Sequence, residues 1–170
     1  NEDLIEQTKI NDLSQAYTFK TVVLMKASLI VFPAGKKILW QGYHAESDGG
    51  SNWGIVTAGA HTDDGGSVFT LADGQYVATN LKGDINIRKF GAKGDAATDD
   101  QPSIQAAIDF SRSTKVPDGL FLVNTELVLS DFGVIFGLGG YATSRLIGGT
   151  SGNNCLRITT TSGSFTKHQA

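Results

Sequence analysis

Cysteine, proline and clustered positive charge are all scarce in this sequence of 170 residues. Its one cysteine, Cys155, cannot form a disulfide within the chain, which excludes a small secreted scaffold stapled by disulfides. A free cysteine of this kind is usually a small buried apolar residue. The 14 basic residues stand against 17 acidic ones and are scattered along the chain. This distribution gives no footprint for nucleic-acid binding and no polybasic patch for a membrane surface.

Long apolar runs are also missing. No stretch approaches the roughly 20 consecutive apolar residues of a membrane-spanning helix, and we therefore expect no membrane insertion. The opening residues, NEDLIEQTKI, lack the basic start and the apolar core of a secretory signal peptide. Because the sequence starts with Asn1 and not with methionine, we expect it to begin inside a longer gene product.

Glycine, by contrast, is abundant, with 21 residues in this chain against an average share of about 7%. Hydrophobic residues make up 40% of the chain, which is enough to bury a core. Short apolar runs rich in Val, Ile, Thr and Phe alternate with Gly, Asp and Asn, the residues that turns favour. The composition therefore predicts a mainly β fold with many turns.

Three regions follow from the spacing of the apolar residues. Residues 1–16 are polar with a loose helical spacing, which predicts an N-terminal arm or a short helix. Residues 17–84 hold short apolar runs separated by turn signals, which predicts a small β-rich domain. In residues 85–170, one helical segment is followed by short strands that alternate with turn residues, as in a solenoid of stacked coils.

The Asp-Gly-Gly sequences at residues 48–50 and 64–66 are interpreted as hairpin corners. Aspartate accepts hydrogen bonds from the backbone that follows it, and glycine adopts positive φ at little cost. Neither sequence supplies the alternating oxygen ligands and the final glutamate of an EF-hand calcium loop. The histidines have no metal-site spacing with Cys, Asp or Glu. We therefore expect no metal site and interpret His44, His61 and His168 as loop residues.

One helix is predicted over about residues 99–113. Pro102 falls in its first turn, where the missing N–H of proline costs least. Small or apolar residues recur at the i, i+3, i+4 and i+7 spacing of one helix face, which predicts a buried stripe. The stripe consists of Ile104, Ala107, Ile108 and Ser111.

Thr98, Asp99 and Asp100 directly precede the main part of this helix. Their side chains are short and carry oxygen atoms. The unpaired N–H groups at a helix start need such acceptors, and the positive end of the helix dipole favours acidic groups. We therefore interpret these residues as a structural helix cap and not as catalytic acids.

The C-terminal half resembles the start of the pectate-lyase-like right-handed parallel β-helix, in the segments FGAKGDAATDDQPSIQAAIDF, KVPDGLFLV, LVLSDFGVIFGLGG and SRLIGG. In that family the first segment begins a helix that caps the N-terminal end of the coil. The resemblance covers about residues 85–149. It departs in one respect, because the Pro-Asp-Gly of residues 117–119 is followed by Leu120 and Phe121, where the family more often has Pro-x-Gly-x-Tyr.

Upstream, the sequence resembles the neck module of bacteriophage tailspikes, in the segment YTFKTVVLMKASLIVFPAGKKILWQGYHAESDGGSNWGIV. In those proteins a GY…DGG…W pattern directly precedes the β-helix. The two resemblances together imply a mainly β chain, with a small β neck domain followed by an N-terminal capping helix and the first coils of a right-handed parallel β-helix.

The tailspike resemblance also implies partners. It implies a homotrimer that belongs to the phage tail in the virion and is assembled in the host cytoplasm. Other phage tail proteins would bind the N-terminal region. A bacterial capsular polysaccharide or lipopolysaccharide would be bound, and usually cut, by a part of the protein that follows this sequence. The resemblance implies no cofactor, and lyase and hydrolase chemistry both stay open.

Only about two coils fit between Gly119 and Ala170, whereas solenoids usually need three or more repeats to bury a continuous core. The last coil would expose an unpaired strand edge, which gives the chain a reason to bind partners. We therefore expect an N-terminal fragment of a longer tailspike, which serves virion attachment, trimerisation and capping of the β-helix.

No residue of this sequence is predicted to be catalytic. Trp40 and Trp53 are candidates for substrate binding, because aromatic rings stack on sugars, although a role in the core or at a subunit contact is favoured over it. Glu126 is a candidate for lining a groove, although no second acid is placed near it as glycoside hydrolysis requires. The G-x-G-x-x-A spacing in VIFGLGGYATS is not interpreted as a nucleotide site, because no helical period and no later acidic residue follow it.

Two alternatives to a polysaccharide-degrading tailspike stay open. The first is a non-catalytic adhesin or connector module of the virion, which would share the fold but lack the carboxylate pair of a cleaving site. The second and weaker one is a secreted pectinase-like enzyme. The tailspike-like neck and the lack of a signal segment in the sequence count against it.

Overall fold

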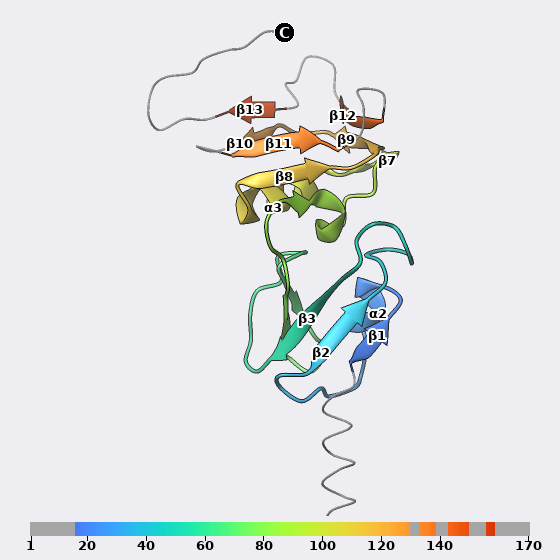
Figure 1. The fold of residues 1–170 in the computed structure, drawn as a ribbon, viewed down its shortest axis with the longest axis vertical. Helices are drawn as coiled ribbons and strands as arrows, with labels where there is room; N and C mark the ends of the chain where they lie inside the picture. The colour runs from blue at the N-terminus through green and yellow to red at the C-terminus, as the bar shows by residue number, and fades with distance from the viewer. Residues whose placement is uncertain (1–15, 130–132, 139–142, 150–155, 159–170) are drawn as a thin grey trace, which may run out of the picture. The chain divides into compact units, whose positions relative to one another are not determined.

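The computed structural model describes residues 16–129, 133–138, 143–149 and 156–158 (Figure 1). The chain divides into two compact units, an N-terminal unit of Asn1–Lys82 and a C-terminal unit of Gly83–Ala170. Each unit buries apolar residues of its own. The arm or helix predicted for residues 1–16 lies outside the described residues, apart from Ala16.

The N-terminal unit is built from one sheet and one short helix. Its elements are β1 (Tyr17–Phe19), α2 (Val22–Lys26), β2 (Lys37–Trp40), β3 (Asn52–Thr57), β4 (Val68–Thr70) and β5 (Tyr76–Thr79). The sheet has five strands in the order β1-β2-β3-β5-β4. β1 runs parallel to β2, with α2 in the connection between them, and the other neighbours are antiparallel.

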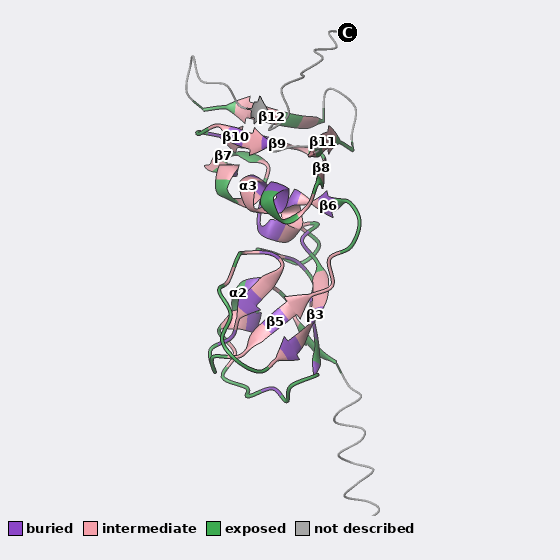
Figure 2. Ribbon diagram, turned by 90° about the vertical axis from the view of Figure 1, so that its left-hand side faces the viewer, coloured by how far each residue is buried: buried purple, intermediate pink, exposed green. Residues whose placement is uncertain are grey.

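The core of the N-terminal unit lies between α2 and one face of the sheet. Along β2 and β3, buried residues alternate with less buried ones, because successive side chains of a strand point to opposite faces (Figure 2). α2 contributes Val22 and Met25, which are three residues apart and share one helix face. The buried cluster consists of Val22, Met25, Phe32, Ile38, Trp40, Val56, Phe69, Leu71 and Val77.

The C-terminal unit consists of short strands and one longer helix. Its elements are β6 (Ile85–Asn86), the 3₁₀ turn η1 (Ile87–Phe90), β7 (Asp95–Asp99), α3 (Gln101–Phe110), β8 (Ser113–Val116), β9 (Gly119–Val123), β10 (Leu127–Leu129), β11 (Val134–Gly137), β12 (Ser144–Gly148) and β13 (Leu156–Ile158). They form three sheets, in the orders β6-β8-β11, β7-β9-β12 and β10-β13.

Every described strand pair of the C-terminal unit is parallel. The chain enters the sheets in the same sequence on each turn, through β8, β9 and β10 and then through β11, β12 and β13 (Figure 1). Strands of successive turns therefore stack on one another, which is the architecture of a parallel β-helix. The predicted fold, mainly β with a β-helix entrance, is confirmed.

α3 follows β7 in the chain, just as β10 follows β9 and β13 follows β12. The helix thus takes the place that a strand of the β10-β13 sheet takes in the later coils, and it packs against β10. Its buried stripe is confirmed for Ile104, Ala107 and Ile108, which are all buried. Ser111, the fourth predicted member, is half-buried and follows the last residue of the helix. The helix is shorter than the predicted residues 99–113. Asp99 pairs with β9 and Ser113 begins β8, so sheet pairing on both sides limits the helix.

Candidate functional site

Asp100 holds a loop and does not cap α3. It occupies the position before the helix, yet its side chain makes no capping hydrogen bond. One carboxylate oxygen accepts from the Lys93 N–H at 2.6 Å and the other from the Gly94 N–H at 3.0 Å. The residue is 1% exposed, and burial raises the pKa of its carboxyl group in spite of these N–H groups. The prediction that Asp100 caps the helix is therefore wrong, because a tertiary contact takes both oxygens.

Thr98 and Asp99 also depart from the predicted cap. The Thr98 hydroxyl donates to Asp95 at 2.8 Å and closes a turn within β7. One oxygen of Asp99 accepts from the N–H of Gln101, the first residue of α3, and from the N–H of Asn124, both at 3.2 Å. The capping prediction is thus wrong for Thr98. For Asp99 it describes one of two contacts, since the same oxygen also ties the segment after β9.

The loop around Lys93 and Gly94 packs against the ring of Phe121, which is fully buried. Gly94 has a φ of +66°, and a Cβ at this position would lie 2.7 Å from the Phe121 ring. Arg88 lies 5.4 Å from the centre of the same ring and donates to the Lys93 carbonyl at 2.7 Å. Glycine is therefore required here by both backbone conformation and space. The role of the FGAKGD segment is therefore structural, because it packs against Phe121 of β9.

The outer edge of β10 is covered by side chains of α3. Gln105 donates to the Val128 carbonyl at 3.0 Å and accepts from the N–H of the same residue at 2.8 Å. One helical turn earlier, Gln101 donates to the Glu126 carbonyl at 3.3 Å. A side-chain amide here presents the donor and acceptor that a neighbouring strand would present. Sequence reasoning missed these residues, and their i, i+4 spacing beside the buried stripe was the available signal.

Glu126 lies directly before β10 and belongs to the contact between β10 and α3 through its main chain. Its side chain is half-buried. The interpretation of Glu126 as a residue that lines a sugar groove stays a prediction, because its described surroundings are those of the β-helix cap.

The two tryptophans have different environments. Trp40 is 3% exposed, its ring meets Phe69 edge-on at 5.5 Å, and its indole N–H donates to the Gly50 carbonyl at 3.2 Å. Its proposed stacking on sugar is therefore wrong, because the ring is part of the core. Trp53 is half-buried, and the Lys37 ammonium lies 4.3 Å from the centre of its ring. A substrate role for Trp53 stays a prediction.

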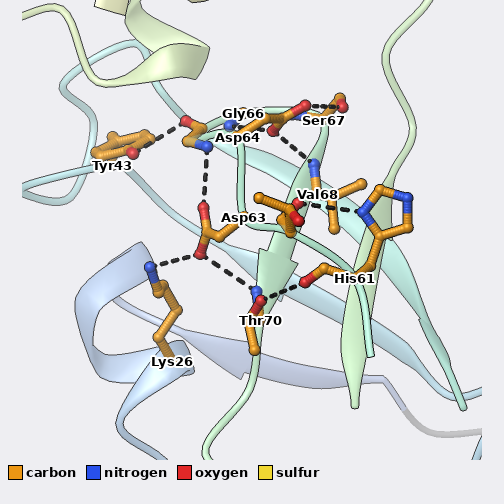
Figure 3. A network of polar contacts seen from close by, with 11 residues as sticks. Lys26, Tyr43, His61, Asp63, Asp64, Gly66, Ser67, Val68 and Thr70 are labelled. Atoms are coloured by element: carbon orange, nitrogen blue, oxygen red, sulfur yellow. Dashed lines mark hydrogen bonds and ion pairs between the residues drawn. The ribbon is translucent and has the colours of Figure 1, made fainter. Parts of the chain in front are cut away.

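Asp63 and Asp64 tie a loop of the N-terminal unit to its sheet and helix (Figure 3). Asp64 accepts from three successive N–H groups, those of Gly66, Ser67 and Val68. Partial burial opposes ionisation of Asp64, but the Ser67 hydroxyl and these N–H groups outweigh it and lower the pKa of Asp64. Because its hydrogen-bond partners are the backbone of the residues that follow it, the Asp64 carboxylate stabilises a turn.

Asp63 connects the same loop to α2. It accepts from the N–H of Gly65 at 2.9 Å and from the Lys26 ammonium at 2.6 Å. Tyr43 adds a further tie by donating from its hydroxyl to the Gly65 carbonyl at 3.0 Å. Burial, followed by the charges of Asp63 and Asp64, raises the pKa of Tyr43 to about 12, so the hydroxyl stays protonated as a donor.

Asp48 closes the other predicted turn. It accepts from the N–H groups of Tyr43, His44, Ala45 and Gly50. A carboxylate with this many N–H donors is a turn former and not a cation ligand. In the part of the chain that the structure describes, no group of three or more His, Cys, Asp or Glu residues could hold a metal ion. Cys155 and His168 lie outside that part.

Residues 84–167 match the family model described as rhamnogalacturonase A/epimerase, pectate lyase-like. Tailspike protein 2 of an Escherichia coli O157:H7 bacteriophage superposes on the chain with a TM-score of 0.66, at 21% sequence identity and over 89% of this chain. The chain has the fold of the phage tailspikes. No curated protein sequence matches it significantly.

Two further structures share the tailspike fold. Pantoea stewartii WceF, a glycan biofilm-modifying enzyme, has a TM-score of 0.60 at 20% identity, over 89% of this chain and 23% of its own. A capsular polysaccharide depolymerase, the tailspike of Acinetobacter baumannii bacteriophage Fri1, has a TM-score of 0.55 at 16% identity, over 74% of this chain and 25% of its own.

The chain spans 21% of the length of the full tailspike protein 2. At such identities the likeness concerns the fold, and it extends over both the sheet of the N-terminal unit and the start of the β-helix. Among the described helices, none has the length and apolar character needed to cross a membrane.

Proposed function

We propose that this chain is the N-terminal part of a phage tailspike that attaches to a bacterial surface polysaccharide and degrades it. In this proposal the N-terminal unit is the neck, which connects to other tail proteins and contributes to a homotrimer. The C-terminal unit begins the β-helix. The observation that carries the proposal is the likeness to tailspike protein 2 over 89% of the chain.

In this proposal the described residues of the C-terminal unit stabilise the start of the β-helix. Asp100 fixes the entrance loop by two N–H contacts, and Gln105 covers the edge of β10. Because α3 covers one end of the β-helix, further coils can stack only on the opposite end, where β11 and β12 lie. We place the polysaccharide site and its reacting acids on later coils, because a cleaving site needs an extended surface that holds several sugar units.

The substrate class in this proposal is a bacterial capsular polysaccharide or lipopolysaccharide. It is supported by the Acinetobacter phage Fri1 structure, which is a capsular polysaccharide depolymerase. WceF supports the wider class of bacterial glycans, and its bacterial source leaves room for a cellular enzyme of the same fold.

The test compares the full-length gene product with the 170-residue chain on a panel of purified capsular polysaccharides and lipopolysaccharides. We expect the full-length protein to release oligosaccharides and the chain alone to release none. New reducing ends without ultraviolet absorbance would indicate hydrolysis, and the absorbance of unsaturated uronates would indicate a lyase.

Two results would overturn parts of this proposal. Binding of a polysaccharide by the full-length protein without any cleavage would replace the degrading enzyme by an adhesin. Cleavage by the chain alone, persisting after repurification and lost in Glu126→Gln, would place the active site in the β-helix entrance instead of on later coils.

A further inference from the structure

Large apolar side chains are concentrated on one exposed segment of the N-terminal unit. Val23 and Leu24 on α2 are 62% and 51% exposed. Leu29, Ile30 and Val31, which follow the helix, are 92%, 46% and 72% exposed. We call these residues the exposed apolar run. Single exposed apolar residues are ordinary on a protein surface, whereas a concentration of them marks a binding surface.

The backbone that carries this run is held in place by local hydrogen bonds. The Thr21 hydroxyl accepts from the Leu24 N–H at 3.3 Å and caps α2. After the helix, the Ser28 hydroxyl accepts from the Ile30 N–H at 3.3 Å. Met25, between the exposed residues of the run, is fully buried and anchors the segment to the core. The apolar side chains are therefore presented by an ordered segment.

The exposed apolar run carries no unpaired charge. Lys26 is the one charged residue in the segment VVLMKASLIVFP. Its ammonium lies 2.6 Å from the carboxylate of Asp63, toward the loop that the two aspartates hold (Figure 3). In a symmetric assembly the same patch of several copies meets near one axis, so an unpaired charge there would face its own copies and repel them. A neutral apolar segment meets its copies without this cost.

We infer that the exposed apolar run is the surface through which copies of this chain associate. The occupant is a second copy, because the run is apolar, neutral and ordered in each chain. Burial of apolar side chains is the dominant favourable contribution to association. This inference rests on the proposed function, since it names the contact of the proposed homotrimer within the neck.

The test introduces charge into the run. The double variant Leu29→Glu/Val31→Glu places like charges on the surface where copies would meet. Its matched control, Ser51→Glu/Thr62→Glu, adds the same charges at exposed polar positions of the same unit. Sedimentation velocity over a range of concentrations gives the oligomeric state, and circular dichroism reports folding. We expect trimers for the wild-type chain and the control, and folded monomers for the Leu29/Val31 variant.

The outcomes separate this inference from the proposed function. If the wild type and the Leu29/Val31 variant are both trimers, the contact lies elsewhere, and the inference is overturned while the tailspike trimer stands. If the wild-type chain is a monomer at every concentration, the inference and the contribution of the neck to the homotrimer are both overturned, while polysaccharide degradation is decided by the separate assay of the full-length protein.

A milder variant covers the case in which the charged variant does not fold. Leu29→Gln removes apolar surface without adding charge. We expect it to raise the concentration at which trimers dissociate by about tenfold or more. An unchanged dissociation midpoint would overturn the inference.

Discussion

The two units of the chain stabilise their sheets by different means. In the N-terminal unit most neighbouring strands are antiparallel, and the carboxylates of Asp48 and Asp64 fix the turns by accepting several backbone N–H groups each. In the C-terminal unit the described strand pairs are all parallel, and α3 covers the free edge of β10 with Gln101 and Gln105. Turn residues can complete an antiparallel sheet locally, whereas a parallel coil needs a separate cap at its end.

The largest expected effect tests whether the two units have independent cores. Phe69 and Phe121 are both fully buried, one in each unit. Phe69→Ala and Phe121→Ala should each cost about 3–5 kcal/mol of unfolding free energy in the unit that carries the substitution. Hydrogen exchange measured peptide by peptide would show lost protection in that unit only. Equal loss in both units for either variant would show that the cores unfold together.

The next effect concerns Asp100. Asp100→Ala removes the carboxylate that accepts from the N–H groups of Lys93 and Gly94, and loss of these two hydrogen bonds to a charged group should cost about 2 kcal/mol in the C-terminal unit. Asp99→Ala is the matched control, since its contacts are longer. Amide exchange should accelerate in the loop of Lys93 and Gly94 more than at the start of α3. The opposite pattern would restore the capping interpretation.

A smaller effect is expected where side chains take the place of a strand. Gln105→Ala removes two hydrogen bonds to Val128 and should cost about 1–2 kcal/mol. Asp109→Ala is the control, because it removes only the other partner of Gln105, whose amide lies 2.8 Å away. The Val128 N–H should exchange faster in Gln105→Ala and at the wild-type rate in Asp109→Ala. An unchanged Val128 rate in both would show that β10 needs no cover.

The smallest effect is a pH dependence of opposite sign for two side chains, Asp48 in the N-terminal unit and Asp100 in the C-terminal unit. Partial burial opposes ionisation of Asp48, but its N–H donors outweigh burial and lower its pKa. Asp48 therefore contributes stability above its unfolded pKa of about 3.9, which is lost as the pH falls through its folded pKa. Burial raises the pKa of Asp100, so its contribution is present below the unfolded pKa and is lost as the pH rises through the folded pKa.

Unfolding of the single variants between pH 2 and pH 6 measures these signs. We expect Asp48→Asn to reduce the acid sensitivity of the N-terminal unit by less than about 1 kcal/mol, because the side chain is half-exposed. Asp100→Asn should instead reduce a loss of stability that accompanies rising pH. The same sign of change in both variants would contradict this assignment.

Local pattern was sufficient to predict several features from the sequence. The i, i+3, i+4 spacing of Ile104, Ala107 and Ile108 correctly predicted the buried face of α3. The Asp-Gly-Gly sequence at residues 48–50 correctly predicted a hairpin corner, which joins the paired strands β2 and β3. For residues 64–66 the hairpin prediction is wrong, because this turn connects β3 to β4, which β5 separates in the sheet. The correctly predicted features depend on residues close together in the chain, which a sequence shows directly.

Features set by distant contacts could not be predicted in this way. Asp100 has the residue type and position of a helix cap, yet its oxygens bind a loop that is placed by packing on Phe121. Trp40 has the residue type of a sugar-stacking side chain, yet in the folded sheet its ring packs against Phe69. The role of Gln105 depends on Val128 in β10, which lies 23 residues further along the chain. In each case the partner is known only once the coils are stacked.

The contact between Gln105 and Val128 has a consequence for every coil that follows. In β10, Leu127 and Leu129 are buried and Val128 between them is less so. A shift of the strand by one residue would turn both leucines outward, because side chains alternate between the two faces. By binding both the N–H and the carbonyl of Val128, Gln105 selects one alignment of the first strand in its sheet. β13 pairs with β10 residue by residue. The side-chain amide of Gln105 therefore also fixes the register of β13, through β10.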